Sequence, residues 1–410
     1  MNKSKYDIDS IKYWDCKLNE RPFYLLDLEK LKSNYKKLND AFKEIYDNFQ
    51  IAYSYKTNYI PAICKTIDEM GGYAEVVSDM ELYLAYKIGV NPKNIIYNGP
   101  YKGKGELDLI EKGGTVVVDN FRQLQEIIDY VLNFKDKQYY IALRINYELI
   151  EGKFSRFGFD INNDDLKRAI DLIKNVDNLN VKGIQCHFSG ARSRTAWKTR
   201  IVTMLGVAEK YFDNNLEFID LGSGMFGEMA KELSCQFADQ PTFMEYANTV
   251  ATEIKGKYKN STNKPKLIVE PGTTLVANTM KMVTKVTSIK DVRGKKFIGL
   301  NASMHNLGEL STKKNLPIEI VKSTSGTNYI SGDLVGYTCL EYDVMYREFK
   351  GDININDYIV FDNVGSYSVV LKPPFILPHC AIIEIKNNEI TKNLLKKNET
   401  YENVFKDYVF

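Results

Sequence analysis

The chain has 410 residues with a formal net charge of +2, and hydrophobic residues make up 44% of it and charged residues 26%. A balance so close to neutral argues against nucleic acid or an anionic membrane as partner, and no apolar run approaches the roughly 20 residues that span a bilayer. The polar first residues lack a secretory signal pattern, and the six scattered cysteines form neither a zinc pattern nor a disulfide framework. We therefore expect a globular protein of the reducing cytoplasm with two domains and no metal.

Short apolar runs alternate with helical patterns along the first two thirds of the chain. The expected strands are 21–27, 51–55, 74–78, 94–98, 115–119, 139–146, 181–187, 216–221 and 266–269, and the expected helices are 31–49, 61–70, 80–88, 103–112, 121–132, 164–174, 195–211 and 241–258. This alternation predicts parallel strands covered by helices, and its length fits an α/β fold of the (β/α)8 TIM-barrel type. A doubly wound open sheet is the alternative, although no GxGxxG follows the first strand.

After residue 275 helical patterns become rare. Short strands are expected at 281–287, 296–300, 317–321, 333–340, 358–361 and 380–385, followed by a short helix within 401–410. Turn residues separate these strands, which is typical of a smaller all-β domain, either a barrel or a sandwich.

Lys56 follows directly on the apolar run 51–55. Burying an unpaired ammonium is costly, and a desolvated lysine becomes a neutral amine that can attack a carbonyl group. The alternative is a strand-end lysine whose stem lies along apolar surface while its ammonium stays in water.

Further polar residues stand at or just after the ends of expected barrel strands, where barrel enzymes carry their working residues. They are Glu75, Arg144, Asn146, His187 and Glu270, together with the turns Gly222-Ser223-Gly224 and Pro271-Gly272-Thr273. Such turns let backbone N–H groups approach a phosphate, although either alone could be an ordinary turn. A lysine amine, a carboxylate, an imidazole and a phosphate cradle together describe a pyridoxal phosphate site.

In these motifs the chain resembles the fold-type III pyridoxal phosphate decarboxylases, the diaminopimelate and ornithine decarboxylase family. The matching segments, in chain order, are 53–58, 75–78, 157–159, 186–190, 220–224, 270–272, 339–343 and 365–367. The resemblance implies an alanine-racemase-like fold, with a cofactor-binding barrel over 28–275 and a β-domain formed by 1–27 and 276–410. It also implies a homodimer with shared active sites.

The resemblance implies roles for individual residues. Lys56 would form a Schiff base, the internal aldimine, with pyridoxal 5'-phosphate, Glu270 would pair with the pyridine nitrogen, and His187 would stack on the ring. Glu75 and Arg144 would line the cofactor pocket. The phosphate would be held by Gly222, Ser223, Gly224, Gly272 and Thr273, helped by Ser189 and Tyr367. Cys339 from a second subunit would help to reprotonate the α-carbon, and Asp343 would approach the substrate amine.

The positions that set substrate specificity depart from this family. Diaminopimelate decarboxylases have an arginine directly after Glu-Pro-Gly, where this chain has Thr273, and a second arginine expected after 301–304 is absent. A distal carboxylate would then be buried without a cation, which is costly. We therefore expect the α-decarboxylation of an amino acid other than meso-diaminopimelate, with a neutral, conjugated or carrier-bound distal end, in a specialised biosynthetic pathway.

Three alternatives remain open from the sequence. Glu309 or Glu341 could bind a distal amine, which would suit a basic amino-acid decarboxylase, and diaminopimelate is the other known substrate class of the family. A fold-type III racemase is less well matched, because such racemases place an arginine opposite the ring nitrogen where this chain has Glu270. A non-catalytic, decarboxylase-like regulator would not need to keep Lys56, His187, Glu270 and Cys339.

Overall fold

The computed structural model describes residues 5–149, 154–387 and 389–410. The chain forms two compact units, a barrel unit (residues 34–227 and 239–274) and a β unit (residues up to 33, 228–238 and 275–410). The sequence places the domain limits at 27/28 and 275/276, and these limits remain a prediction. The two compact units are divided at 33/34 and 274/275, and the β unit also includes residues 228–238.

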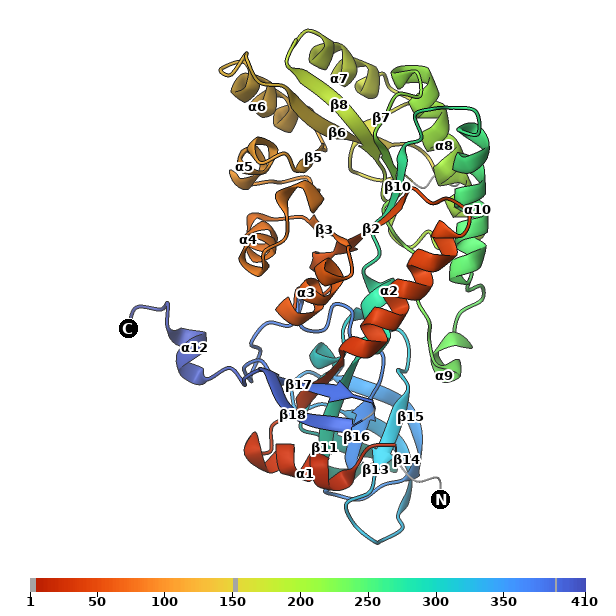
Figure 1. The fold of residues 1–410 in the computed structure, drawn as a ribbon. Coiled ribbons are helices and arrows are strands. Elements are labelled where there is room, and N and C mark those ends of the chain that lie inside the picture. The colour runs from red at the N-terminus through yellow and green to blue at the C-terminus, as the bar shows by residue number, and fades with distance from the viewer. Residues whose placement is uncertain (1–4, 150–153, 388) are drawn as a thin grey trace. The chain divides into compact units, whose positions relative to one another are not determined.

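Parallel strands form a closed barrel in the barrel unit (Figure 1). In the described part of the chain they are β2 (Phe49–Ser54), β3 (Tyr73–Val76), β4 (Ile95–Tyr97), β5 (Thr115–Val118), β6 (Tyr139–Asn146), β8 (Leu179–Gln185), β9 (Phe218–Asp220) and β10 (Lys266–Val269). β10 pairs with β2 and β5 pairs with β6, which closes the circle, while the short β7 (Phe159–Asp160) adds to β6. The predicted TIM-type barrel is confirmed, and the open sheet is excluded.

Helices alternate with these strands along the chain and flank them in Figure 1. They are α2 (Leu28–Lys43), α3 (Pro61–Glu69), α4 (Asp79–Ile88), α5 (Gly105–Glu111), α6 (Phe121–Val131), α7 (Asp165–Lys174), α8 (Arg194–Phe212) and α10 (Phe243–Lys257). Polar caps begin several of them: Ser78, Asn120, Ser193 and Thr242 each accept a backbone N–H from the first turn. Inside the barrel, Ala52, Val117, Phe218 and Ile268 belong to one buried cluster, so the barrel is a packed core.

The β unit is built mainly from strands. They are β1 (Phe23–Asp27), β11 (Met280–Val292), β12 (Lys295–Leu300), β13 (Ile318–Val321), β14 (Tyr329–Val335), β15 (Val344–Asp352), β16 (Tyr358–Phe361), β17 (Ala381–Lys386) and β18 (Glu389–Lys396). β1 pairs antiparallel with β11 and parallel with β17, so the first strand of the chain joins the C-terminal sheet, as the resemblance implied. The remaining α-helices among the described residues are α1 (Ile8–Lys17), α9 (Lys231–Ser234), α11 (Thr273–Val276) and α12 (Tyr401–Phe405).

Some local predictions were wrong. The strand expected at 333–340 is β14, which begins at Tyr329 and ends at Val335, so residues 336–340 lie outside any strand. The helix expected over 31–49 ends at Lys43. Helix α1 was not expected, because its polar sequence hides the two large residues, Ile11 and Trp14, that it buries. None of the helices in the described ranges is long and apolar enough to cross a membrane.

Candidate active site

Lys56 lies just beyond the C-terminal end of β2, in the single turn Tyr55–Thr57. Its Nζ donates to both oxygens of Glu75, at 3.0 Å from Oε1 and 2.9 Å from Oε2. Glu75 on β3 is fully buried, while about a third of the Lys56 side chain is exposed. Burial alone would raise the pKa of Glu75, but the Lys56 ammonium and hydrogen bonds from Ser54, Lys56 and Asn98 together lower it. Glu75 is therefore ionised, and it holds the amine at the barrel end.

Glu270 follows β10 and is 3% exposed. The Asn98 amide donates to Glu270 Oε1 and to Glu75 Oε1, and Gln185 Nε2 donates to Glu270 Oε2 at 3.0 Å. No cation of the described chain lies within ion-pair distance of Glu270, and burial, followed by the charge of Glu75, raises its pKa to about 7. Neighbouring Asp220 is fully buried, and burial and then Glu270 hold its pKa well above the usual range. The cluster thus contains one ionised carboxylate and two carboxyl groups that retain protons easily.

His187 lies two residues beyond β8 and meets the glycine turn that follows β9. The Ser223 N–H donates to His187 Nδ1 at 3.2 Å, and the Gly222 N–H donates to Asp220 Oδ1 at 2.8 Å. Loss of hydration, and then the charges of Lys56, Arg144 and Arg200, hold the pKa of His187 well below its usual range. The ring is therefore neutral and carries its proton on Nε2, which lies 3.5 Å from the hydroxyl of the exposed Ser189.

Two glycines bring the backbone of this region close together. Gly222 has φ +62°, and a Cβ there would lie 2.5 Å from the Cys186 carbonyl oxygen. A Cβ on Gly272 would lie 1.9 Å from Thr57 Oγ1, and the Ser54 N–H donates to the Pro271 carbonyl at 3.3 Å. The turns that carry Lys56 and Glu270 are thus in direct contact, and neither glycine position tolerates a side chain.

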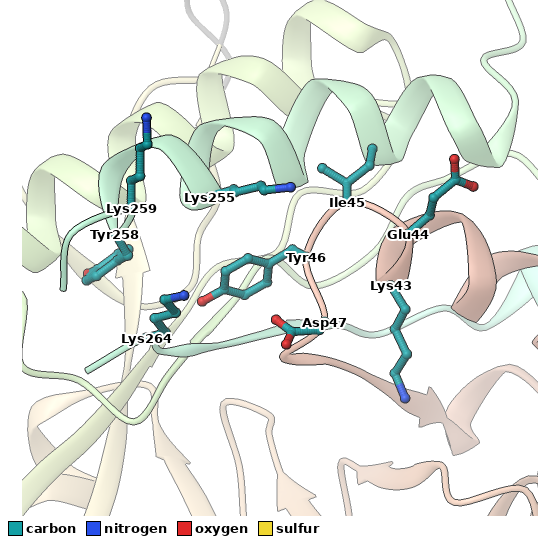
Figure 2. A pocket seen from close by; sticks show the side chains of 9 residues that line it. All are labelled: Lys43, Glu44, Ile45, Tyr46, Asp47, Lys255, Tyr258, Lys259 and Lys264. Carbon is teal, nitrogen blue, oxygen red and sulfur yellow. The ribbon is translucent and has the colours of Figure 1, made fainter. Parts of the chain in front are cut away.

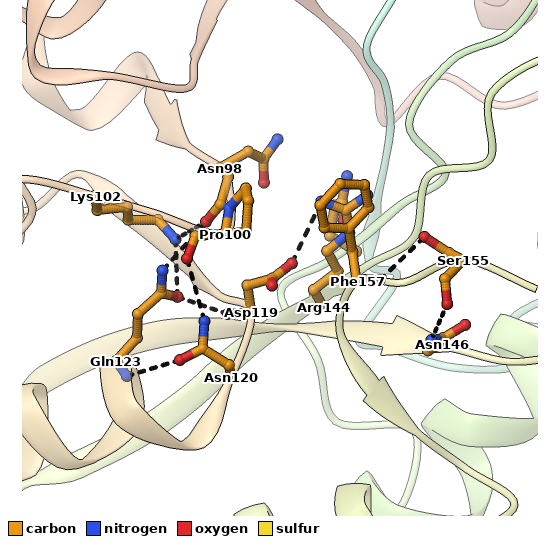
Figure 3. A network of polar contacts seen from close by, with 12 residues as sticks. Asn98, Pro100, Lys102, Asp119, Asn120, Gln123, Arg144, Asn146, Ser155 and Phe157 are labelled. Carbon is orange, nitrogen blue, oxygen red and sulfur yellow. Dashed lines mark hydrogen bonds and ion pairs between the residues drawn. The ribbon is translucent and has the colours of Figure 1, made fainter.

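Arg144, at the end of β6, forms an ion pair with Asp119 at 3.4 Å, and both side chains are buried (Figure 3). Its guanidinium lies 4.6 Å from the centre of the Phe157 ring. Asn146 on the same strand donates to the Ser155 carbonyl at 2.7 Å, which ties down the loop before Phe157. Arg144 thus has a fixed position, and its charge acts on His187.

Several polar residues of this region were not predicted. Asn98 follows β4 and Gln185 ends β8, so the rule that working residues stand at strand ends could have found both. Lys102 donates to the Gly99 carbonyl at 2.7 Å and to Gln123 Oε1 at 3.1 Å (Figure 3), and burial lowers its pKa to about 8.

Other predicted residues lie in the β unit. Cys339, Glu341 and Glu309 are exposed, whereas Asp343 is 3% exposed. The Asp343 carboxylate accepts from the Met304 N–H at 2.8 Å and from the Thr338 hydroxyl at 2.6 Å, so it holds the loop on which Cys339 stands. Its contact with a substrate amine stays a prediction.

Tyr367, also in the β unit, has φ +58°, a left-handed conformation that is rare for a bulky residue. Strain of this kind concentrates at functional sites, which agrees with the predicted role of Tyr367 without testing it.

A cavity of about 360 Å³ opens at the other end of the barrel (Figure 2). It is lined by residues 43–47, which precede β2, and by Lys255, Tyr258, Lys259 and Lys264, which precede β10. These residues lie near the N-terminal ends of β2 and β10, away from Lys56, Glu75 and Glu270. Within the described residues, no group of three or more His, Cys, Asp or Glu side chains could hold a metal ion.

The residues at the C-terminal end of the barrel fit pyridoxal phosphate. The Lys56 amine can bond to its aldehyde, and the Glu270 carboxyl group, whose pKa is about 7, can pair with its ring nitrogen. The glycine turns leave no room for side chains, which suits a phosphate that must approach the backbone closely. Among the described residues, the buried oxygens Asn98 Oδ1 and Gln185 Oε1 also lack a hydrogen-bond partner. Such buried acceptors suit a ligand that brings polar hydrogen atoms into this cluster.

Comparisons with known proteins agree with this fit. Residues 28–277 match the family described as "Pyridoxal-dependent decarboxylase, pyridoxal binding domain". Diaminopimelate decarboxylase of Aquifex aeolicus is 26% identical over 88% of this chain and 86% of its own length, and that of Methanocaldococcus jannaschii is 28% identical over 85% and 82%.

Solved structures show the same fold. The crystal structure of the M. jannaschii diaminopimelate decarboxylase has a TM-score of 0.85 at 23% identity, covering 97% of this chain and 94% of that one. The lysine/ornithine decarboxylase of Vibrio vulnificus has a TM-score of 0.75 at 19% identity, covering 93% and 99%.

Proposed function

The chain belongs to the pyridoxal-dependent decarboxylases, and from this premise we propose that it removes the α-carboxylate of an amino acid as CO2, using pyridoxal phosphate held by Lys56. The cofactor, when bound, supplies an electron sink for the electron pair that departing CO2 leaves behind. One observation carries this choice of reaction: the residue available to the ring nitrogen is the carboxyl group of Glu270, and its pKa is raised to about 7. A carboxylate keeps that nitrogen protonated, which favours loss of CO2 over the racemase alternative.

The surrounding side chains would hold this arrangement in place. Asn98 and Gln185 fix both oxygens of Glu270, so its carboxyl plane cannot rotate freely. Neutral His187 offers a flat, uncharged surface for stacking. Glu75 lies within 3.0 Å of Lys56 Nζ and so stabilises a proton on that amine, which Lys56 could return to the α-carbon.

We propose meso-diaminopimelate as the first substrate to test, since the two relatives that were compared by sequence above are diaminopimelate decarboxylases. This reverses the expectation drawn from the sequence alone. One specific observation still favours a second candidate, an amino acid with a neutral, conjugated or carrier-bound distal end. Thr273, which begins α11, stands where the family resemblance calls for an arginine that grips the distal carboxylate.

The proposal includes a homodimer, in which Cys339 of one copy would serve as proton donor at the barrel of the other. Cys339 is exposed on its own unit, which leaves its thiol available to a partner. Cys339 and the other five cysteines of the chain are free, which suits a reducing compartment such as the cytoplasm.

The test is CO2 release by the purified protein from meso-diaminopimelate, lysine, ornithine, arginine, glutamate, glutamine and carrier-linked glutamate. Lys56→Ala should abolish release and also the visible absorbance of bound cofactor, whereas Lys255→Ala, at the opposite end of the barrel, should change neither. Preference for diaminopimelate would support the first candidate, and preference for a neutral or linked amino acid the second. Exchange of enantiomers without CO2, from protein that binds the cofactor, would overturn the decarboxylase proposal.

A further inference from the structure

Arg200 lies in the middle of α8 and is 0% exposed, although it carries a full positive charge. Its Nη1 donates to the carbonyls of Ser223 at 2.7 Å and Leu221 at 3.3 Å. Its Nη2 donates to the carbonyls of Phe188 and Ala191, both at 2.9 Å. A single guanidinium therefore joins the loop after β8 to the glycine turn after β9.

These bonds fix the direction of the N–H groups on the far side of the same peptides. In a trans peptide the C=O and the following N–H point in opposite directions. Because the Leu221 and Ser223 carbonyls point toward Arg200, the N–H groups of Gly222 and Gly224 point away from it. The Gly222 N–H donates to Asp220 Oδ1, so the Gly224 N–H is the one of the two that can meet a ligand. The Phe188 carbonyl orients the N–H of Ser189 in the same way. The N–H groups of Gly224 and Ser189 are thus turned away from the guanidinium.

The charge of Arg200 has no carboxylate partner within the described chain. The groups that face the guanidinium are the ring of Trp197 at 4.7 Å, the ring of Phe188 at 5.6 Å, and the neutral side chains of Cys186, Tyr147 and Tyr246. Its Nε also lacks a hydrogen-bond partner. Buried charges are normally paired, because an unpaired one loses its hydration without compensation. An anion bound close to this arginine would supply that compensation.

We propose that Arg200 is the positioning residue for the cofactor phosphate, acting from behind the glycine turn without touching the ligand. It would aim the N–H groups of Gly224 and Ser189 at the phosphate, and its own single charge would offset part of the charge of that dianion across one layer of peptide. A Cβ on Gly224 would lie 3.4 Å from Arg200 Nη2, which shows how close the turn and the guanidinium are. The proposal rests on cofactor binding alone, so it can be tested whatever the substrate is.

The experiment compares pyridoxal phosphate with pyridoxal, which lacks the phosphate, as ligands of the apoprotein. Arg200→Gln should weaken pyridoxal phosphate binding about 10- to 100-fold, the range expected when one partly screened charge is lost. Binding of pyridoxal should change by less than about 3-fold, since only a small charge effect remains. Arg194→Gln is the matched control on the same helix, because Arg194 is exposed and pairs with Glu245, and it should change neither affinity. Equal losses for both ligands would show a merely structural role and overturn the proposal.

Arg200→Lys keeps the charge but not the two-armed guanidinium, so it serves if the glutamine variant does not fold. It should retain most of the preference for the phosphorylated ligand while shifting the phosphorus NMR signal of the bound cofactor, because the turn is held less firmly. If Arg200→Lys lost this preference completely although the charge is still present, the proposed effect of the Arg200 charge on phosphate binding would be contradicted. In the wild-type apoprotein, millimolar inorganic phosphate should raise Tm more than chloride at equal ionic strength, and the absence of this rise would also refute the proposal.

Discussion

Replacing Glu270 with glutamine should change how the stability of the cofactor-free protein depends on pH. The pKa of Glu270 is raised from 4.5 to about 7, so the folded state binds this proton more tightly than the unfolded state. A raised carboxyl pKa contributes stability that is fully present below pH 4.5 and is lost as pH rises through 7. A shift of that size corresponds to about 3 kcal/mol. Urea unfolding of the wild-type apoprotein should therefore lose about 3 kcal/mol over this window relative to Glu270→Gln.

Wild type must be compared with Glu270→Gln, because a pH series on wild type alone also contains the contributions of other groups. Asp220, Glu81 and Glu106 have raised pKa values as well, so they too make the protein less stable as pH rises. Glutamine keeps the volume of Glu270 but leaves an amide donor of Asn98 or Gln185 less well paired, which costs a constant amount at every pH. Only the slope is therefore interpreted. Glu75→Gln is the control of opposite sign, since the lowered pKa of Glu75 adds stability at neutral pH that is lost on acidification. Parallel stability curves for wild type and Glu270→Gln would contradict a raised pKa of Glu270 in the folded protein.

Three further predictions concern single positions around the site. Gly272→Ala should destabilise the protein by at least about 2 kcal/mol in thermal melts, because its Cβ would lie 1.9 Å from Thr57 Oγ1, and Thr57→Ala in the same chain should recover part of the loss. Cys339→Ser should lower kcat with little change in KM or in Tm, since the side chain is exposed, and an unchanged kcat would exclude it as proton donor. Thr273→Arg should raise kcat/KM for diaminopimelate relative to glutamine, and a fall in that ratio would argue against the missing-arginine interpretation.

The apolar pattern predicted the barrel well because its strands are nearly continuous apolar runs. The expected limits of β6, β10 and β16 agree with the structure to the residue. Strands of the β unit were harder to predict where one face is exposed. In β18 most residues are partly or fully exposed, so the sequence shows no alternation of apolar and polar residues that would predict this strand. Residues 336–340 contain apolar side chains, yet Asp343 and Gly336 hold them in a loop.

The predicted site was incomplete for a different reason. Lys56, Glu75, His187 and Glu270 stand at strand ends and could be recognised there, but their polar partners come from other strands and only the fold brings them together. Arg200 left a trace in the sequence. Trp197 and Met204 lie three residues before it and four after it, and both are buried, so helical spacing places Arg200 on the inward face of α8. A charged residue on the buried face of a helix indicates that it has a polar partner in the interior. Hydrophobic periodicity alone does not identify that partner.

Two buried side chains of the site lack a partner of opposite charge within the described chain, and one ligand can supply a partner to each of them. Glu270 is buried without a cation within ion-pair distance, and Arg200 is buried without an anion among the described residues. A molecule with a protonated ring nitrogen at one end and a phosphate at the other would place a positive charge at Glu270 and a negative charge near Arg200. Anything that binds only the folded state stabilises it according to its concentration and Kd. Pyridoxal should therefore flatten the pH slope due to Glu270 without supplying the anion for Arg200, inorganic phosphate should do the reverse, and the complete cofactor should produce both effects together.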